Sequence, residues 1–405
     1  MARDRKSVPF TTEVVLMCAM AAWFTVTTYF AWVQDSAWNY WEQFMKVLLF
    51  ALLTPVLIHG RVRTEWLVIV VTGSLAFYGL KGGWFTVTTG GQSHVLGPPR
   101  SFISGNTNLG LAMLMVMPLT LVLARQLVQG RLACLPHNAW TRLAGWGSYL
   151  TFYLTGIAAV FTYSRGALVG LAAIAPFLFA KMRHKLALVL LAVLAVTAIG
   201  ITVPDKLVNR AETIQTYEED GSAMSRLQAW DVAFHIALEN PLTGGGFRLS
   251  GIGTEQWLSY TDIRGFWTNS ARAAHSNYFQ VLGEHGFAGL TLYLGLLGSV
   301  CLALLRLARR AKAMAETVWI SEYAWGILVG IIAYAVAGAF LDMAYFTLFY
   351  AFVALTIVLR REYEQALAAQ PEAEHATGGS SGTTVGQGAP GQAMRSARSD
   401  PYGRA

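Results

Sequence analysis

The chain has 405 residues, of which 54% are hydrophobic and only 13% are charged. A soluble globular protein commonly carries about 25% charged residues, so this composition argues against a soluble enzyme. The composition also argues against a nucleic-acid-binding protein, although the net charge is +7. In a membrane protein, the excess basic residues normally lie on the cytoplasmic side next to anionic lipid. The three cysteines are far apart in sequence, so they predict neither a disulfide framework nor a metal knuckle.

Long apolar runs recur along the chain, and a bilayer core requires about 20 such residues per helix. No small-residue cleavage site follows the first run, so no cleavable signal peptide is expected. The sequence predicts an all-α integral membrane protein with ten membrane spans. The expected spans are residues 12–33, 43–58, 65–80, 107–124, 146–163, 166–180, 186–203, 287–305, 322–340 and 343–359.

The distribution of basic residues favours ten spans with both termini inside. The short segments expected inside are rich in Lys and Arg, whereas the short outside loops carry few. This asymmetry is typical of cytoplasmic loops, and an odd number of spans would break it. The inside residues are Arg3, Arg5, Lys6, Arg61, Arg63, Arg125, Arg131, Arg142, Lys181, Arg183, Lys185, Arg306, Arg309, Arg310, Lys312, Arg360 and Arg361.

Four regions follow from these spans. Residues 1–203 form a seven-span membrane region, and residues 204–276 form a long outside stretch with many charges, which predicts a small helical domain. Residues 277–363 form a three-span membrane region. From about residue 370 the chain becomes rich in Gly, Ser, Ala, Gln and Pro, so residues 364–405 are predicted to form a disordered cytoplasmic tail.

The run TYSRGALVG places Arg165 in a very short turn between the fifth and sixth spans, at the outer membrane surface. A charged arginine near hydrocarbon costs free energy, so it usually has an ion-pair partner or a functional role. One interpretation is an arginine that extends its charge from the interface into water. The other is a phosphate clamp, because a guanidinium stays charged and offers paired donors, and Ser164 and Gly166 leave room for a ligand.

Residues 223–239 predict a helix in the outside stretch, ended by the glycines at 244–246. Arg226 and Trp230 are four residues apart and therefore share one face of this helix. Arg226 either forms a structural salt bridge with the acidic run at 218–220 or binds substrate. The three glycines either let a sugar or phosphate approach the backbone or simply cap the helix.

His275 stands where the outside stretch ends and the eighth span approaches, in the run HSNYFQVLGEHGFAG. A lone histidine is more often a structural hydrogen-bonding residue. At the edge of a polar domain, however, a neutral imidazole can accept a proton from a sugar hydroxyl. Glu284 and His285 are expected near the interface rather than deep in lipid.

Other polar residues share the outside face. Of these, Arg100 follows a Gly-Pro-Pro turn and is the strongest candidate for substrate contact. The acidic run at 218–220 is typical of a solvated face, so no metal site is predicted. The candidate substrate contacts are Lys81, Arg100, Arg264, Arg272 and Ser276. Residues of this face expected to be mostly solvated or structural include His94, Asn106, Asn108, Arg210, Arg248 and Asp342.

The runs TYSRGAL, SRLQAW, PLTGGGF and HSNYFQVLGEHGFAG, in this order, resemble the O-antigen ligase and polymerase superfamily. The last run is the most specific, through His275, Ser276, Gly286 and Gly289. In the first half, WNYWEQFMKVLLF, FYGLKGGWFTVTTGG and GPPRSFISGNTNLGLAMLMVMPL resemble a subgroup of O-glycosylation ligases associated with exosortase systems. The resemblance covers roughly residues 8–360.

Members of that family transfer a glycan from undecaprenyl diphosphate to an acceptor at the periplasmic face of the bacterial inner membrane. The resemblance implies an all-helical glycosyltransferase of the membrane-embedded C type, with a periplasmic helical domain and an acceptor hydroxyl on the lipid A core. It implies no cofactor. By resemblance, Arg165 and Arg226 match the family's essential arginines and His275 its essential histidine. Members commonly have more spans than the ten expected here.

The resulting hypothesis is an inverting, metal-independent transfer in which two arginines hold the diphosphate and His275 deprotonates the acceptor. A glycan polymerase and a protein O-glycosylation ligase remain alternatives, because the acceptor has no readable sequence code. A transporter of lipid-linked glycans would place charges at the bilayer midplane and show an internal repeat. Here the charges gather on one face and no repeat is visible.

Overall fold

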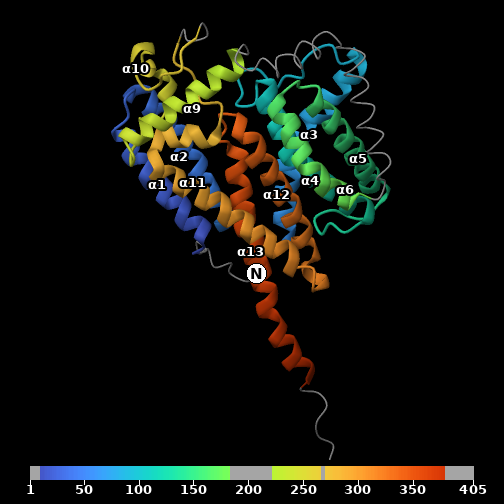
Figure 1. Ribbon diagram of the computed structural model, residues 1–405. Coiled ribbons are helices and arrows are strands. Elements are labelled where there is room, and N and C mark those ends of the chain that lie inside the picture. The colour runs from blue at the N-terminus through green and yellow to red at the C-terminus, as the bar shows by residue number, and fades with distance from the viewer. Residues whose placement is uncertain (1–9, 183–220, 266–269, 379–405) are drawn as a thin grey trace, which may run out of the picture. The chain divides into compact units, whose positions relative to one another are not determined.

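The computed structural model describes residues 10–182, 221–265 and 270–378, and these residues form helices with no strand. The chain divides into two compact units, residues 1–364 and 365–405. The helices are α1 (Thr12–Tyr29), α2 (Gln34–Leu57), α3 (Arg61–Thr89), α4 (Asn106–Gln129), α5 (Ala139–Val160), α6 (Arg165–Lys181), α9 (Gly221–Glu239), α10 (Thr254–Leu258), α11 (Asn277–Arg310), α12 (Val318–Ala337) and α13 (Thr347–Gly378) (Figure 1). Single 3-10 turns occur at Leu249–Gly251, Ala315–Thr317 and Gly338–Phe340.

Five helical stretches among the described residues are long and apolar enough to cross a membrane. Together they make the chain a multi-pass α-helical membrane protein. The expected seventh span, residues 186–203, lies outside the described residues, so the count of ten stays a prediction. The five stretches are Thr12–Tyr29, Arg61–Thr89, Asn106–Gln129, Asn277–Arg310 and Ala315–Phe340.

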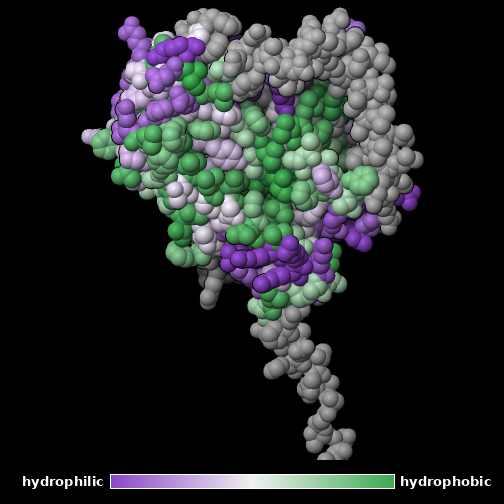
Figure 2. Space-filling view, viewed as in Figure 1, coloured by the Kyte–Doolittle hydropathy of each residue, from purple (hydrophilic) through white to green (hydrophobic). Residues whose placement is uncertain are grey.

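One end of the first unit carries the beginnings of α6 and α11, and we call it the upper end, as drawn in Figure 1. The short connections at 30–33 and 161–164 reverse the chain, so α1 and α5 end there while α2 and α6 begin there. On the face seen in Figure 2, hydrophobic residues cover the middle and hydrophilic ones gather at the upper left and the lower edge. This pattern is typical of a membrane helix bundle whose two ends are exposed to water.

Helix α4 forms the centre of the bundle, because every residue from Leu109 to Ala124 is buried. It packs against α3, α5, α6 and α12. Small residues permit the close approach: a Cβ atom added at Gly330 of α12 would overlap the carbonyl oxygen of Met115. A helix that is apolar on all sides is thus enclosed by its neighbours.

Helix α3 continues nine residues past the end of the expected span at residue 80. The reason is that Gly79 and Gly83 are packing positions rather than helix breakers, since a Cβ atom at either would overlap Thr155 or Leu154 of α5. The expectation that Lys81 lies in an outside loop is therefore wrong, because Lys81 is an exposed residue of α3.

Helix α13 extends to Gly378, past residue 364, where a disordered tail was expected to begin. The expectation of disorder from 364 onward is therefore wrong for residues 364–378. The segment just before and after residue 364 is rich in Glu, Ala, Leu and Gln, which are strong helix formers, and Arg360 pairs with Glu364 one turn later at 2.9 Å. Residues 379–405 lie outside the described part.

The packing of α12 on α4 predicts a position-specific effect of a β-branched residue. Gly330→Val should lower the unfolding free energy by about 2–3 kcal/mol, because the added side chain meets the Met115 backbone. The matched control is Gly298→Val on α11, where an added Cβ atom meets nothing within 4 Å. Thermal unfolding in detergent measures both, and equal midpoints for the two variants would contradict this account of the packing.

Candidate functional site

The turn before α6 is fixed from three sides. Ser164 caps α6 by accepting a hydrogen bond from the Ala167 N–H at 3.2 Å. Asn106 at the beginning of α4 donates through Nδ2 to the Thr162 carbonyl at 2.8 Å. Tyr163 has a left-handed backbone (φ 54°), and its hydroxyl donates to the carbonyl of Gly91. Arg165, the first residue of α6, is thereby held at the upper end with its side chain exposed.

Arg165 and Arg226 line one cavity of about 200 Å³ between α6 and α9, which we call the arginine cavity. Arg226 is half-buried on α9. The structure therefore brings together two arginines that are far apart in sequence. Apart from them the lining is largely apolar, with Gly166, Val169, Ala223, Leu227, Trp230 and Phe340.

Trp230 connects the arginine cavity to the segment that carries His275. Its indole Nε1 donates to the carbonyl oxygen of Ala274 at 2.7 Å. Its ring stacks on Phe279 of α11, with centroids 5.1 Å apart and planes at 7°. The helix that carries Arg226 thus also holds the backbone of the residue before His275.

His275 itself has a left-handed backbone (φ 47°), which a non-glycine residue adopts only under constraint. Its Nδ1 lies 2.9 Å from Oδ2 of Asp342, and the His275 side chain is 52% exposed. A carboxylate at this distance fixes the ring orientation and stabilises the imidazolium formed on proton uptake. Asp342 was expected to be solvated or structural, whereas the structure makes it the partner of His275.

Polar side chains of α11 hold the loop that carries Asp342. The side-chain oxygen of Asn277 accepts from the Met343 N–H at 2.7 Å, and that of Gln280 accepts from the Ala344 N–H at 3.4 Å. In the sequence, Asn277, Gln280 and Glu284 are spaced by three and four residues in an otherwise apolar run. That spacing on one helix face is the sequence signal from which the binding of the Asp342 loop by α11 could have been predicted.

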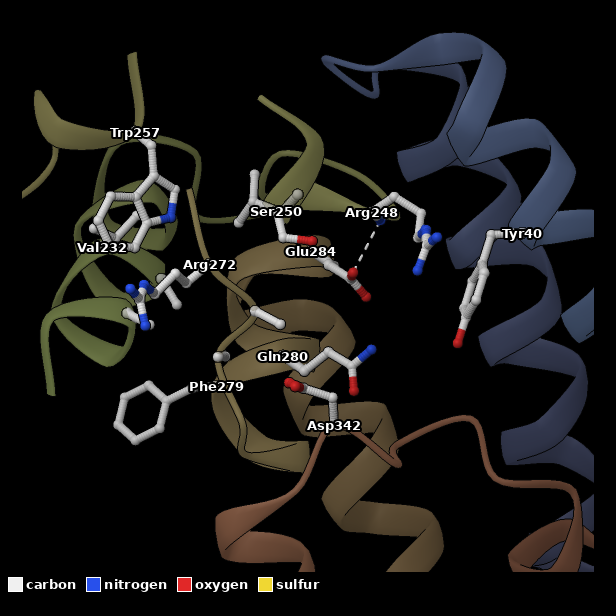
Figure 3. Close-up of a pocket in the computed structure, with 15 residues that line it drawn as sticks. Tyr40, Val232, Arg248, Ser250, Trp257, Arg272, Phe279, Gln280, Glu284 and Asp342 are labelled. Carbon is white, nitrogen blue, oxygen red and sulfur yellow. Dashed lines mark hydrogen bonds between the residues drawn. The ribbon is translucent and has the colours of Figure 1, made fainter. Parts of the chain in front are cut away.

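A second cavity, of about 110 Å³, lies beside Asp342, and we call it the polar cavity (Figure 3). Buried Glu284 accepts hydrogen bonds from the backbone N–H of Arg248 at 2.9 Å and from the Tyr345 hydroxyl at 2.6 Å. In Figure 3, Arg248 and Tyr40 lie on one side of the cavity. On the opposite side lie Arg272, Trp257 and Phe279.

The three glycines at 244–246 hold their loop against α11. The N–H groups of Gly245 and Gly246 donate to the carbonyls of Gly283 and Glu284 on α11, each at 2.9 Å. Gly244 and Gly246 have positive φ, and a Cβ atom at either would overlap backbone. Neither of the two uses expected for these residues included this packing, which seats the loop on α11.

The glycines and the second histidine of the HSNYFQVLGEHGFAG run are likewise packing residues. Gly286 has φ 66° at a kink in α11. A Cβ atom at Gly289 would overlap His285, which is buried and stacked on Phe24 with ring centroids 3.6 Å apart. The Nδ1 of His285 lies 2.6 Å from the Thr27 hydroxyl. This part of the run fastens α11 to α1.

The structure separates the candidate substrate contacts. Arg272 lines the polar cavity, and Ser276 is the buried N-cap residue of α11. Lys81, Arg100 and Arg264 line neither cavity, and Arg264 donates to the Leu258 carbonyl at 2.8 Å. Their substrate roles stay predictions, while the acidic run at 218–220 and Arg210 lie outside the described residues.

Two family models match parts of the chain. Residues 150–294 match the family model described as O-antigen ligase. The match supports the O-antigen ligase superfamily. It covers Arg165, Arg226 and His275, and it supports a membrane glycan ligase or polymerase type of function. Residues 1–128 match a family of unknown function, and no curated protein matches the chain.

The indole bond of Trp230 predicts a local change in backbone protection. Trp230→Phe keeps a ring to stack on Phe279 but removes the donor to Ala274, a loss of about 1 kcal/mol. Amide exchange around residues 272–276 should accelerate about fivefold in hydrogen-exchange mass spectrometry. The control is Trp38→Phe, which removes an exposed indole bond to Gln34. Unchanged exchange in the Trp230 variant would show that the bond does not hold this segment.

Proposed function

We propose that the chain is an O-antigen ligase-type glycosyltransferase. It moves a glycan from undecaprenyl diphosphate to a hydroxyl of the lipid A core, at the periplasmic face of the bacterial inner membrane. The observation that carries this proposal is the placement of two arginines in one cavity, with Trp230 linking that cavity to the His275–Asp342 pair.

The arginine cavity suits the donor. Its two guanidinium groups match the paired oxygens of a diphosphate, and they stabilise the negative charge that grows on the leaving group. The apolar part of its lining, including Val169 and Leu227, suits the first isoprene units of a lipid carrier. Because two fixed cations supply the charge, we propose that the reaction requires no metal ion and no cofactor.

His275 acts as the general base in this proposal. The acceptor oxygen attacks the anomeric carbon and its proton passes to His275. The bond between that carbon and the diphosphate oxygen breaks, and undecaprenyl diphosphate leaves. A single displacement inverts the anomeric centre. Asp342 holds the imidazole in place and stabilises its protonated form.

We also infer the membrane topology that this chemistry needs. Ten spans with both termini in the cytoplasm put the upper end of the bundle in the periplasm, together with residues 204–276 as a helical domain. The lower end carries Arg309 and Arg310 at the end of α11, as expected for a cytoplasmic end. The resemblance of the first half to exosortase-associated ligases stays a prediction.

The base assignment predicts a large loss of turnover. In nanodiscs, with an undecaprenyl-diphosphate-linked glycan as donor and rough lipopolysaccharide as acceptor, His275→Ala should lower kcat by about 10²–10⁴-fold. The matched control is His235→Ala on α9, an exposed histidine that pairs with Asp231 at 3.2 Å and lines neither cavity. Near-normal turnover of the His275 variant would eliminate it as the base. Donor use without transfer to lipopolysaccharide would refute the lipid A core as acceptor.

The diphosphate clamp predicts an effect that depends on guanidinium geometry. Arg226→Gln should lower kcat/KM for the donor by about a hundredfold, or about 3 kcal/mol. Arg226→Lys keeps the charge but loses the paired donors, so its activity should lie between wild type and the Gln variant. Arg309→Gln, at the far end of α11, serves as the control. A Gln variant with wild-type kcat/KM would remove Arg226 from the clamp.

A further inference from the structure

Arg248 is held in an unusual position at the edge of the polar cavity. Its backbone is left-handed (φ 63°), which a non-glycine residue adopts only when other contacts fix it. The N–H of Arg248 donates to Glu284, and its guanidinium carbon lies 5.3 Å from the ring centroid of Tyr40 on α2. Two helices from distant parts of the sequence therefore orient one exposed arginine (Figure 3).

The neighbouring carboxylate does not neutralise this arginine through an ion pair. Both oxygens of Glu284 are occupied, one by the backbone of Arg248 and the other by the Tyr345 hydroxyl. Within the described residues, the guanidinium of Arg248 makes no hydrogen bond and no ion pair. A structural arginine would be expected to use its five donors on protein acceptors. Arg248 instead presents its donors outward beside a cavity.

The cavity next to this guanidinium has the features of a small sugar-binding site. Ser250 and Gln280 supply polar groups, while Tyr40 and Trp257 supply aromatic surface. Its volume of about 110 Å³ is below that of a pocket for a whole drug-sized ligand, so it accommodates part of one sugar residue. Asp342 lines the cavity and also pairs with His275.

Helix α9 separates the two cavities. Arg226, Leu227 and Trp230 face the arginine cavity. Ala229, Val232 and Ala233 face the polar cavity. A ligand in the polar cavity is therefore distinct from a diphosphate bound by Arg165 and Arg226, yet it lies beside the partner of the base.

We propose that the polar cavity is the acceptor subsite, and that Arg248 binds an anionic substituent, a phosphate or a carboxylate, on the acceptor sugar. This inference rests on the proposed function and specifies the chemical class of its acceptor. A planar guanidinium braced on an aromatic ring is suited to phosphate and carboxylate oxygens, which it binds through two parallel hydrogen bonds.

The test is direct binding to the full-length chain in phosphatidylcholine nanodiscs, followed by saturation-transfer-difference NMR. The probes are methyl glucoside 6-phosphate and unmodified methyl glucoside. The phosphorylated probe should bind about tenfold more tightly, and Arg248→Gln should reduce its affinity to that of the neutral probe. Arg248→Lys should retain part of the preference. Equal binding of the two probes to the wild-type protein would overturn the proposal.

Two further variants locate the binding site of the phosphorylated probe and show that the loss of affinity is specific to Arg248. Arg309→Gln, at the opposite end of α11, should leave the preference for the phosphorylated probe unchanged. Arg226→Gln should also leave it unchanged, because Arg226 lines the other cavity. Loss of the preference in the Arg226 variant would assign the phosphate to the donor site. Survival of the preference in Arg248→Gln would show that Arg248 does not bind the phosphate, and either result would overturn the proposal. An unchanged gel-filtration profile of Arg248→Gln shows that the variant is folded.

The transfer assay separates this inference from the proposed function. With phosphorylated rough lipopolysaccharide, Arg248→Gln should raise the acceptor KM about tenfold and leave the donor KM unchanged. No transfer of the glycan from the lipid-linked donor to lipopolysaccharide by the wild-type protein would refute the function, while the binding preference of Arg248 would still stand. An acceptor KM that Arg248→Gln does not change would refute the inference alone.

Discussion

A row of polar side chains on one face of α11 holds the upper end of the protein together. Asn277 and Gln280 bind the backbone of the loop that carries Asp342, and Glu284 binds the backbone of Arg248. Each side chain satisfies a buried or partly buried backbone N–H, which would cost about 1–3 kcal/mol if it were buried without a partner. The positions of His275 and Arg248 both depend on this row, because it fixes the loop of Asp342, the partner of His275, and binds the backbone of Arg248 directly.

The packing of the three glycines on the α11 kink complements this row. Backbone hydrogen bonds from Gly245 and Gly246 to α11 bring the loop within reach of Glu284. Larger residues at 244 or 246 would push the loop away and withdraw the N–H of Arg248 from the carboxylate. Backbone conformations that only glycine adopts easily therefore serve here to position a charged side chain two residues further on.

The sequence predicts the fold class from local signals, and the resemblance to the O-antigen ligase and polymerase superfamily selects the two arginines of the arginine cavity. Apolar runs predict the helices, and the short turn around Arg165 predicts its place at one end of the bundle. Helix ends are less predictable: Gly79 and Gly83 resemble breakers, yet they are packing positions of α3. The roles of Asp342 and Arg248 were out of reach, because their partners His275 and Tyr40 come from distant segments and depend on left-handed backbones at residues 248 and 275.

In the proposed reaction, the positions of the arginines on either side of α9 allow His275 to serve two anionic ligands. A diphosphate and an anionic acceptor repel each other, and each must therefore have its own cation to lie near a common reacting carbon. Arg165 and Arg226 line one cavity, whereas Arg248 borders the other. The Trp230 indole, bonded to the carbonyl of Ala274 and stacked on Phe279, fixes the distance between the two sides. In the proposed reaction, a rigid aromatic spacer at this point keeps His275 aligned while two charged lipids bind, which a flexible loop would not do.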